Sequence, residues 1–349
     1  MIESIKFENF KALREATLPL GQFILIVGPN GGGKATALSA PSFITAPQNW
    51  DFEQVRTAGI SDSASVVIEA KWRGTWESDA GDFVLTSTWS KDQMGGTEVR
   101  SENERRHGDP GGPLNALARS RLFLLDANRV AQEVPVRPNI ELGADGFGLA
   151  GVLGRLRDQH PDDFHALNQR LAEWIPDFDH VLFETRQQGN RSICLRTRDA
   201  RNVIRSCDLS EGTLLALAIL TIGYLPDPPP VICIKDPDRG LHPRLLRDVR
   251  DMLYRLAYPE DGRKPVQVIM TTHNPYFLEL FRKHPEQIVV AEKDGLDARF
   301  SRLSERTDLT EIVRDIPLSR VWDNREPIDA AAGTKNLLNP RYRPQFKLR

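Results

Sequence analysis

The chain contains few cysteines and almost no net charge. Its 349 residues include three cysteines, Cys194, Cys207 and Cys233, whose spacing does not match a metal site. We expect Cys194 and Cys233, which lie in apolar stretches, to be reduced core thiols. A net charge of −2 gives no global signature of nucleic-acid or membrane binding. We recognise no signal peptide, and no apolar run approaches the roughly 18 residues that span a bilayer. We therefore expect a cytoplasmic protein without membrane association.

The chain also lacks a hydroxyl at one position of its clearest motif. Residues 28–35 are Gly-Pro-Asn-Gly-Gly-Gly-Lys-Ala, which fits the G-x-x-x-x-G-K pattern of a phosphate-binding loop. Ser or Thr normally follows the lysine and ligates Mg²⁺, but this chain has Ala35. Thr36 carries a hydroxyl one residue later, which on a helix lies roughly 100° further around the axis. We therefore expect a nucleotide site without its usual magnesium ligand.

The flanking residues support a phosphate-binding loop. The apolar run Phe23–Val27 predicts a buried parallel strand before it. Residues 35–40 suit a helix that ends at Pro41. A strand, a glycine loop and a helix start together place an anionic phosphate on free backbone N–H groups. The predicted nucleotide-binding residues of this loop are Asn30, Gly31, Gly33, Lys34, Ala35 and Thr36.

Strand and helix patterns alternate along the rest of the chain, which predicts an α/β protein with a mostly parallel core sheet. Residues 1–20 suit two short strands. Residues 41–59 are expected to be irregular, and the polar residues 90–113 to form an exposed loop or hairpin tip. Further strands are expected at residues 63–72, 83–89, 120–126, 181–185, 192–196, 231–234, 266–270 and 288–291, and helices at residues 150–174 with a break at Pro161, 214–225 and 243–257.

Three more motifs lie in the second half of the chain. They are Leu-Ser-Glu-Gly-Thr at residues 209–213, Lys-Asp-Pro-Asp-Arg-Gly-Leu-His-Pro at residues 235–243 and Thr-Thr-His-Asn-Pro at residues 271–275. Ser210 precedes an apolar helix pattern, so it is first of all a candidate N-cap. His273 follows an apolar strand, at the edge where ligands bind in open α/β sheets. It is a candidate γ-phosphate sensor, and a purely structural histidine is the alternative.

With these motifs in this order, the chain resembles the RecF-like and SMC-like ATPases of the ABC class, including small bacterial members of DNA-repair and anti-phage systems. The resemblance covers about residues 1–325. It implies ATP as the ligand and an ABC-type P-loop NTPase head with an antiparallel β subdomain and a helical insert. Ser210 and Gly212 then match the ABC signature, residues 235–243 match the Walker B stretch, and His273 matches the switch histidine. The implied division is a phosphate-loop lobe (1–60), an antiparallel β region (61–126), a helical and hairpin insert (127–205), a lobe with the three distal motifs (206–325) and a C-terminal tail (326–349).

The Walker B stretch departs from this family. Aligned on Pro237, Lys235 stands where the magnesium-orienting Asp belongs, and Asp236 stands at the position of the Glu that orients the attacking water. Shifted by one residue, Asp236 replaces the magnesium Asp and the base is lost. Ala35 and Lys235 both affect the metal, so Mg²⁺ binding is doubtful. Lys235 either supplies part of the missing charge to the phosphates or turns away from them. The predicted catalytic residues are Asp236 and His273, with Lys235 as a nucleotide contact and no metal ligands.

The resemblance implies a dimerising ATP switch that acts on a separate DNA-acting partner, in particular a nuclease. The dimer would form from two copies or from this chain and a homologous subunit. The alternatives are a nucleotide-independent scaffold and an active ATPase with an atypical metal site. No nuclease motif is recognised after residue 300, and we expect Pro317–Trp322 to be a core-capping helix. Candidate DNA contacts are Arg100, Arg105, Arg106, Arg341, Arg343, Lys347 and Arg349.

Overall fold

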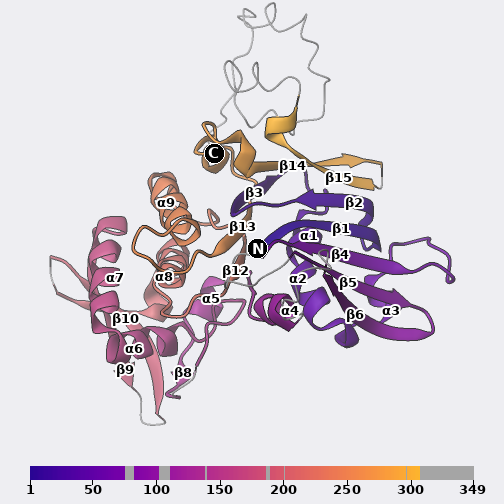
Figure 1. Ribbon diagram of the computed structural model, residues 1–349. Coiled ribbons are helices and arrows are strands. Elements are labelled where there is room, and N and C mark those ends of the chain that lie inside the picture. The colour runs from indigo at the N-terminus through magenta and orange to yellow at the C-terminus, as the bar shows by residue number, and fades with distance from the viewer. Residues whose placement is uncertain are drawn as a thin grey trace, which may run out of the picture.

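A six-stranded sheet forms the centre of the molecule (Figure 1). The computed structural model describes residues 1–74, 82–101, 111–137, 140–185, 189–199, 201–295 and 297–306. The strand order is β15-β14-β3-β13-β12-β7, and every neighbouring pair is parallel except β14 and β15. The mostly parallel core sheet is therefore confirmed. The strands are β3 (Phe23–Val27), β7 (Arg121–Phe123), β12 (Val231–Lys235), β13 (Gln267–Thr271), β14 (Ile288–Asp294) and β15 (Asp297–Arg302).

Successive residues of the central strands enter two different cores. In β3, Phe23, Leu25 and Val27 pack into one core, whereas Ile24 and Ile26 pack into the other. Each strand side therefore meets a separate layer of the protein. This accounts for the uninterrupted apolar runs in the sequence, because a strand buried on both faces has no polar face to show.

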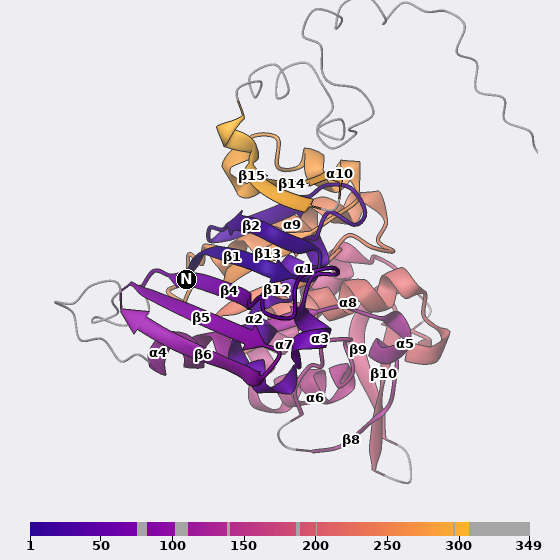
Figure 2. The same cartoon turned by 90° about the vertical axis from the view of Figure 1, so that its right-hand side faces the viewer.

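An antiparallel sheet covers one face of the central sheet (Figure 2). Its order is β2-β1-β4-β5-β6, so it includes the two strands expected in residues 1–20. The short helices α1 and α2 share its core. The elements are β1 (Ile2–Phe10), β2 (Leu13–Pro19), β4 (Val66–Trp72), β5 (Phe83–Ser90), β6 (Gln93–Ser101), α1 (Lys34–Leu38), α2 (Ala40–Thr45), α3 (Phe52–Val55) and α4 (Gly111–Ala118).

Helices and a small sheet cover the opposite face (Figure 1). The expected helices at 150–174, 214–225 and 243–257 are all present. As predicted, the first of these regions breaks at Pro161 into the two helices α6 and α7. The elements are α5 (Ala127–Val130), α6 (Leu149–Gln159), α7 (Pro161–Trp174), α8 (Glu211–Gly223), α9 (Leu246–Ala257), α10 (Pro275–Glu279), β8 (Val134–Pro135), β9 (Phe178–Thr185), β10 (Asn190–Thr197) and β11 (Val203–Arg205).

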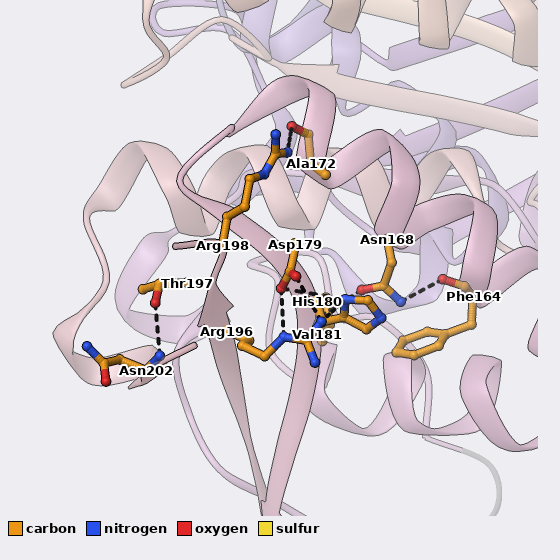
Figure 3. Close-up of polar contacts among 10 residues, drawn as sticks. All are labelled: Phe164, Asn168, Ala172, Asp179, His180, Val181, Arg196, Thr197, Arg198 and Asn202. Carbon is orange, nitrogen blue, oxygen red and sulfur yellow. Dashed lines mark hydrogen bonds and ion pairs between the residues drawn. The ribbon is translucent and has the colours of Figure 1, made fainter. Parts of the chain in front are cut away.

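Polar contacts fasten the predicted β9–β10 hairpin to α7 (Figure 3). The amide of Asn168 donates to the carbonyl of Phe164 at 2.9 Å and accepts from the N–H of Val181 at 2.7 Å. Asp179 and Arg196 form a bidentate ion pair across the hairpin, with both distances 2.8 Å. Asn168 is 4% exposed, so its two hydrogen bonds satisfy an otherwise costly buried amide.

Two expectations about residues 41–59 are wrong. Pro41 does not end a helix but lies in the first turn of α2, where proline needs no N–H partner. The rest is not irregular, because α3 follows. Asp51 caps α3 by accepting from the N–H of Gln54, and the Gln54 side chain accepts from the N–H of Asp51.

The expectation that the polar residues 90–113 form an exposed loop or hairpin tip is wrong for residues 93–101 and 111–113. Residues 93–101 form β6, the edge strand beside β5, and α4 begins at Gly111. Thr97 shares a hydrogen bond with Ser87 at 2.7 Å and donates to the carbonyl of Ile44, also at 2.7 Å. Polar side chains of this strand therefore find partners inside the protein, which local sequence patterns do not reveal.

Two strand expectations were inexact at the sheet edges. β7 ends at Phe123, and Leu124 is 46% exposed, so the apolar run 120–126 is only partly a strand. β15 was not expected at all.

Within the described residues, no helix is both long and apolar enough to cross a bilayer. Everything after Arg306 lies outside these residues, including the element at Pro317–Trp322 and four of the candidate DNA contacts. The candidates Arg105 and Arg106 also lie outside them.

Candidate functional site

The sequence motifs meet at one edge of the central sheet. The strands β3, β12 and β13 run parallel, so their carboxyl ends lie together (Figure 1). The phosphate loop follows β3, Lys235 ends β12, and His273 follows β13. The pKa values of Lys34 and His273 both respond to the charges of Lys235 and Asp236, which requires these four groups to be close neighbours.

Glycines give the phosphate loop its shape. Gly28, Gly31 and Gly33 have φ angles of 143°, 77° and 77°, in the region that L side chains rarely adopt. A Cβ on Gly28 would lie 2.2 Å from the carbonyl oxygen of Ala291, and one on Gly33 would lie 2.5 Å from Leu13. The loop therefore has both the backbone conformation and the close packing of a phosphate cradle, and its residues fit a nucleotide phosphate.

Lys34 is buried at the start of α1. Its side chain is 6% exposed, and its ammonium group donates to the carbonyls of Gly28 at 2.7 Å and Pro29 at 2.9 Å. Burial lowers its pKa from 10.5 to about 8, although the charge of Asp236 opposes this effect. In this conformation the ammonium group therefore closes the loop on itself.

The residues next to Lys34 do not supply a metal ligand. Ala35 is exposed and carries only a methyl group, and Thr36 is half-buried. Asn30 is exposed at the tip of the loop. Among the described residues, no cluster of three or more His, Cys, Asp or Glu side chains could hold a metal ion. The groups beside the loop are a methyl at Ala35, an ammonium at Lys235 and the single carboxylate of Asp236, a set that fits Mg²⁺ poorly.

Hydrogen bonds hold Asp236 at the end of β12. Its N–H donates to the carbonyl of Thr271 at 3.1 Å, and the Thr271 hydroxyl donates back to its carboxylate at 3.1 Å. Its φ is 49°, an unusual value for a residue with a side chain. This strained turn orients Asp236. Lys235, the last residue of β12, is exposed.

A hollow of about 140 Å³ opens beside these two charged residues. It is lined by Leu124, Leu125, Leu215, Ile219, Lys235, Asp236, Pro237 and Arg239.

A second carboxylate, Asp238, was missed in the sequence. It is 7% exposed and accepts a hydrogen bond of 2.7 Å from the Thr272 hydroxyl, which itself accepts from the N–H of Asn274. Burial raises the pKa of Asp238 above its ordinary value. Asp238 thus joins the loop after β12 to the turn that carries His273. Its position directly after Pro237, in the Walker B-like stretch, was the sequence signal that could have identified it.

His273 lies in that turn with its side chain exposed. Partial desolvation, and then the ammonium group of Lys34, lower its pKa below 6.5. The imidazole is therefore neutral at pH 7, with one nitrogen able to donate and the other able to accept.

Ser210 is the N-cap of α8, as predicted. Its hydroxyl accepts from the N–H of Thr213 at 3.2 Å. A Cβ on Gly212 would lie 2.6 Å from the carbonyl oxygen of Gly240, so this glycine permits α8 to touch the loop after β12. Within the described part of the chain, Ser210 and Gly212 form no hydrogen bond with the phosphate loop.

Comparison with known proteins agrees with this arrangement. Residues 162–279 match the family model described as AAA domain, putative AbiEii toxin, Type IV TA system. The chain is 24% identical to an OLD nuclease from Thermus scotoductus (strain ATCC 700910 / SA-01), over 84% of this chain and 63% of that protein. It therefore spans less than two thirds of that relative's length.

Two solved structures are also similar. One is the SMC head domain from Thermotoga maritima, with a TM-score of 0.49 and 14% identity, over 86% of this chain and 98% of that one. The other is the recombination mediator protein RecF, with a TM-score of 0.48 and 12% identity, over the same shares of the two chains. The family match covers the three distal motifs, and both comparisons give what the chain is similar to: an AAA domain of the family model and an OLD nuclease.

Proposed function

We propose that the chain is an ATP-binding switch that dimerises on its nucleotide and hydrolyses it slowly or not at all. The observation that carries this proposal is a contrast between the phosphate-binding residues and the residues at the usual metal-ligand positions, at the same edge of the sheet. The glycine cradle and Lys34 are in place, whereas Ala35 and Lys235 stand on the metal side of the same site.

The chain's own groups would bind the triphosphate without a metal ion. Backbone N–H groups of the loop hold the β-phosphate, and Lys34 turns from its two carbonyls toward the phosphate oxygens. Lys235 adds a second ammonium at the end of β12. A neutral His273 donates its N–H toward the γ-phosphate and so distinguishes ATP from ADP. These roles agree with the effect of Lys235 and Asp236 on the pKa values of Lys34 and His273, both of which burial lowers.

Hydrolysis should suffer more than binding. Asp236 remains as a carboxylate that can orient a water molecule, and Thr271 fixes its position. A metal ion contributes several kcal/mol of transition-state stabilisation in phosphoryl transfer, and a lysine at position 235 does not coordinate one. ATP would consequently remain bound and keep the switch closed.

Dimerisation would complete the site. Each copy presents its cradle and, elsewhere, the capped start of α8 at Ser210 and Gly212. The free N–H groups at the start of this 13-residue helix can bind the γ-phosphate of a second copy or of a homologous subunit.

A separate effector would carry the nucleolytic chemistry. The relative from Thermus scotoductus is called a nuclease, and this chain matches 63% of it. We propose that the closed dimer controls a nuclease that acts on DNA. The purified chain should leave DNA and RNA intact with or without ATP and divalent metals.

Light scattering with and without ATP tests the switch. The wild-type chain should change from monomer to dimer on addition of ATP. Ser210→Asp should stay monomeric, because aspartate still caps α8 but repels the γ-phosphate. Ser210→Thr, which keeps both the cap and a hydroxyl, is the matched control and should dimerise. A dimer that forms equally without ATP would favour the scaffold alternative, and rapid Mg²⁺-dependent phosphate release would favour an active ATPase.

A further inference from the structure

The strand β14 forms one wall of the phosphate loop. Val290 of β14 pairs with Val27, the last residue of β3, so β14 continues alongside the loop that follows β3. The carbonyl of Ala291 fills the space beside Gly28, and the Ala291 methyl lies 3.6 Å from where a Cβ of Gly32 would be. The loop is therefore shaped by β14 as well as by its own glycines.

A lysine of β14 extends this wall over the loop. The ammonium nitrogen of Lys293 lies 3.6 Å from the position that a Cβ of Gly31 would occupy. Gly31 is exposed, and its φ of 77° turns the loop at this point. An exposed lysine thus places its charge directly at the phosphate cradle.

Lys293 has an exposed side chain at this point of the loop. Among the described residues it has no hydrogen-bond or ion-pair partner. Two acids close to it in the chain pair with arginines, Glu292 with Arg306 at 3.1 Å and Asp297 with Arg14 at 3.4 Å. Lys34 differs, since two carbonyls already hold its ammonium group. Lys293 is therefore the more readily available ammonium at the loop.

We propose that Lys293 is an additional phosphate-binding residue of the nucleotide site. This inference rests on the proposed nucleotide binding and extends it. A triphosphate without Mg²⁺ keeps its full negative charge, so its binding needs cationic groups on more than one side. Lys235 approaches from β12, Lys34 lies beneath the loop, and Lys293 approaches from β14, on the opposite side of β3 from β12.

Calorimetric titrations without Mg²⁺ test this assignment. Lys293→Gln should bind ATP roughly tenfold more weakly than the wild type, the usual effect of losing one hydrogen bond to a charged group. Lys293→Arg should restore most of the affinity. Lys283→Gln removes an exposed lysine before the amino end of β14, far along the chain from the loop, and should leave the affinity unchanged.

A second ligand identifies the group that is recognised. Inorganic tripolyphosphate has no sugar or base, and its affinity should fall by the same factor in Lys293→Gln. The melting temperature of each nucleotide-free variant should equal that of the wild type, because the side chain is exposed.

The outcomes separate this assignment from the function on which it rests. Wild-type affinity in Lys293→Gln, or a loss seen with ATP but not with tripolyphosphate, would overturn the assignment and leave the switch intact. A lower melting temperature without ligand would instead make Lys293 a structural residue of the loop. Failure of the wild-type chain to bind ATP would overturn both proposals.

Discussion

Lys34→Met should make the nucleotide-free protein more stable while abolishing nucleotide binding. The lysine is 6% exposed, and burial lowers its pKa from 10.5 to about 8. That difference corresponds to about 3 kcal/mol of stability lost by holding a charged amine in this position. The hydrogen bonds to Gly28 and Pro29 recover part of it, at about 1 kcal/mol each at most. Methionine keeps the apolar stem, so we expect a net gain of about 1–2 kcal/mol at pH 7.

The pH dependence of this gain follows from the direction of the shift. Because the pKa of Lys34 is lower in the folded than in the unfolded protein, the unfolded chain binds more protons between about pH 8 and pH 10.5. The free energy of unfolding of the wild type should therefore rise with pH across that window. The destabilisation is fully present below about pH 8, so the advantage of Lys34→Met should shrink toward zero by about pH 9.5.

Urea denaturation at pH 7, 8 and 9 measures this difference. Lys283→Met is the matched control, and because Lys283 is exposed its effect should stay within about 0.5 kcal/mol. If Lys34→Met is less stable than the wild type at every pH, the carbonyl contacts outweigh the burial of charge and the reasoning is wrong.

Three other predictions follow from the same site. ATP affinity should fall as the pH rises through about 8, because Lys34 loses its proton there, and Lys34→Arg should bind ATP with little pH dependence between pH 7 and 9 in the same titration. Ala35→Ser combined with Lys235→Asp should restore measurable Mg²⁺-dependent phosphate release, and neither change alone should suffice. Gly28→Ala should lower the free energy of unfolding by roughly 2 kcal/mol or more in urea, because its Cβ would lie 2.2 Å from the Ala291 carbonyl oxygen; wild-type stability would show that the loop can shift.

Local sequence patterns predicted two kinds of element. One kind is stabilised by residues close in sequence, and the other is a strand buried on both faces. The run Phe23–Val27 needed no knowledge of its partners, since a short apolar run before a glycine loop is typical of a strand buried on both faces. The N-cap at Ser210 was likewise visible, because a cap acts within three residues. The boundaries of the proposed lobes remain predictions.

Long-range contacts account for what the sequence did not show. The polar strand β6 depends on Ser87 and Ile44, residues that come earlier in the chain. The contact by which Asp238 joins two loops becomes visible only once Thr272 is placed beside it. Lys293 lies more than 250 positions after Gly31, and only the pairing of β14 with β3 brings them together.

Titration of the wild-type chain with ATP, in EDTA and in Mg²⁺, tests the central claim most directly. If Ala35 and Lys235 replace the magnesium ligands as proposed, the dissociation constants in the two conditions should agree within about threefold, a difference below 1 kcal/mol. Tight binding in Mg²⁺ that is lost in EDTA would show that another residue holds the metal and would contradict this account.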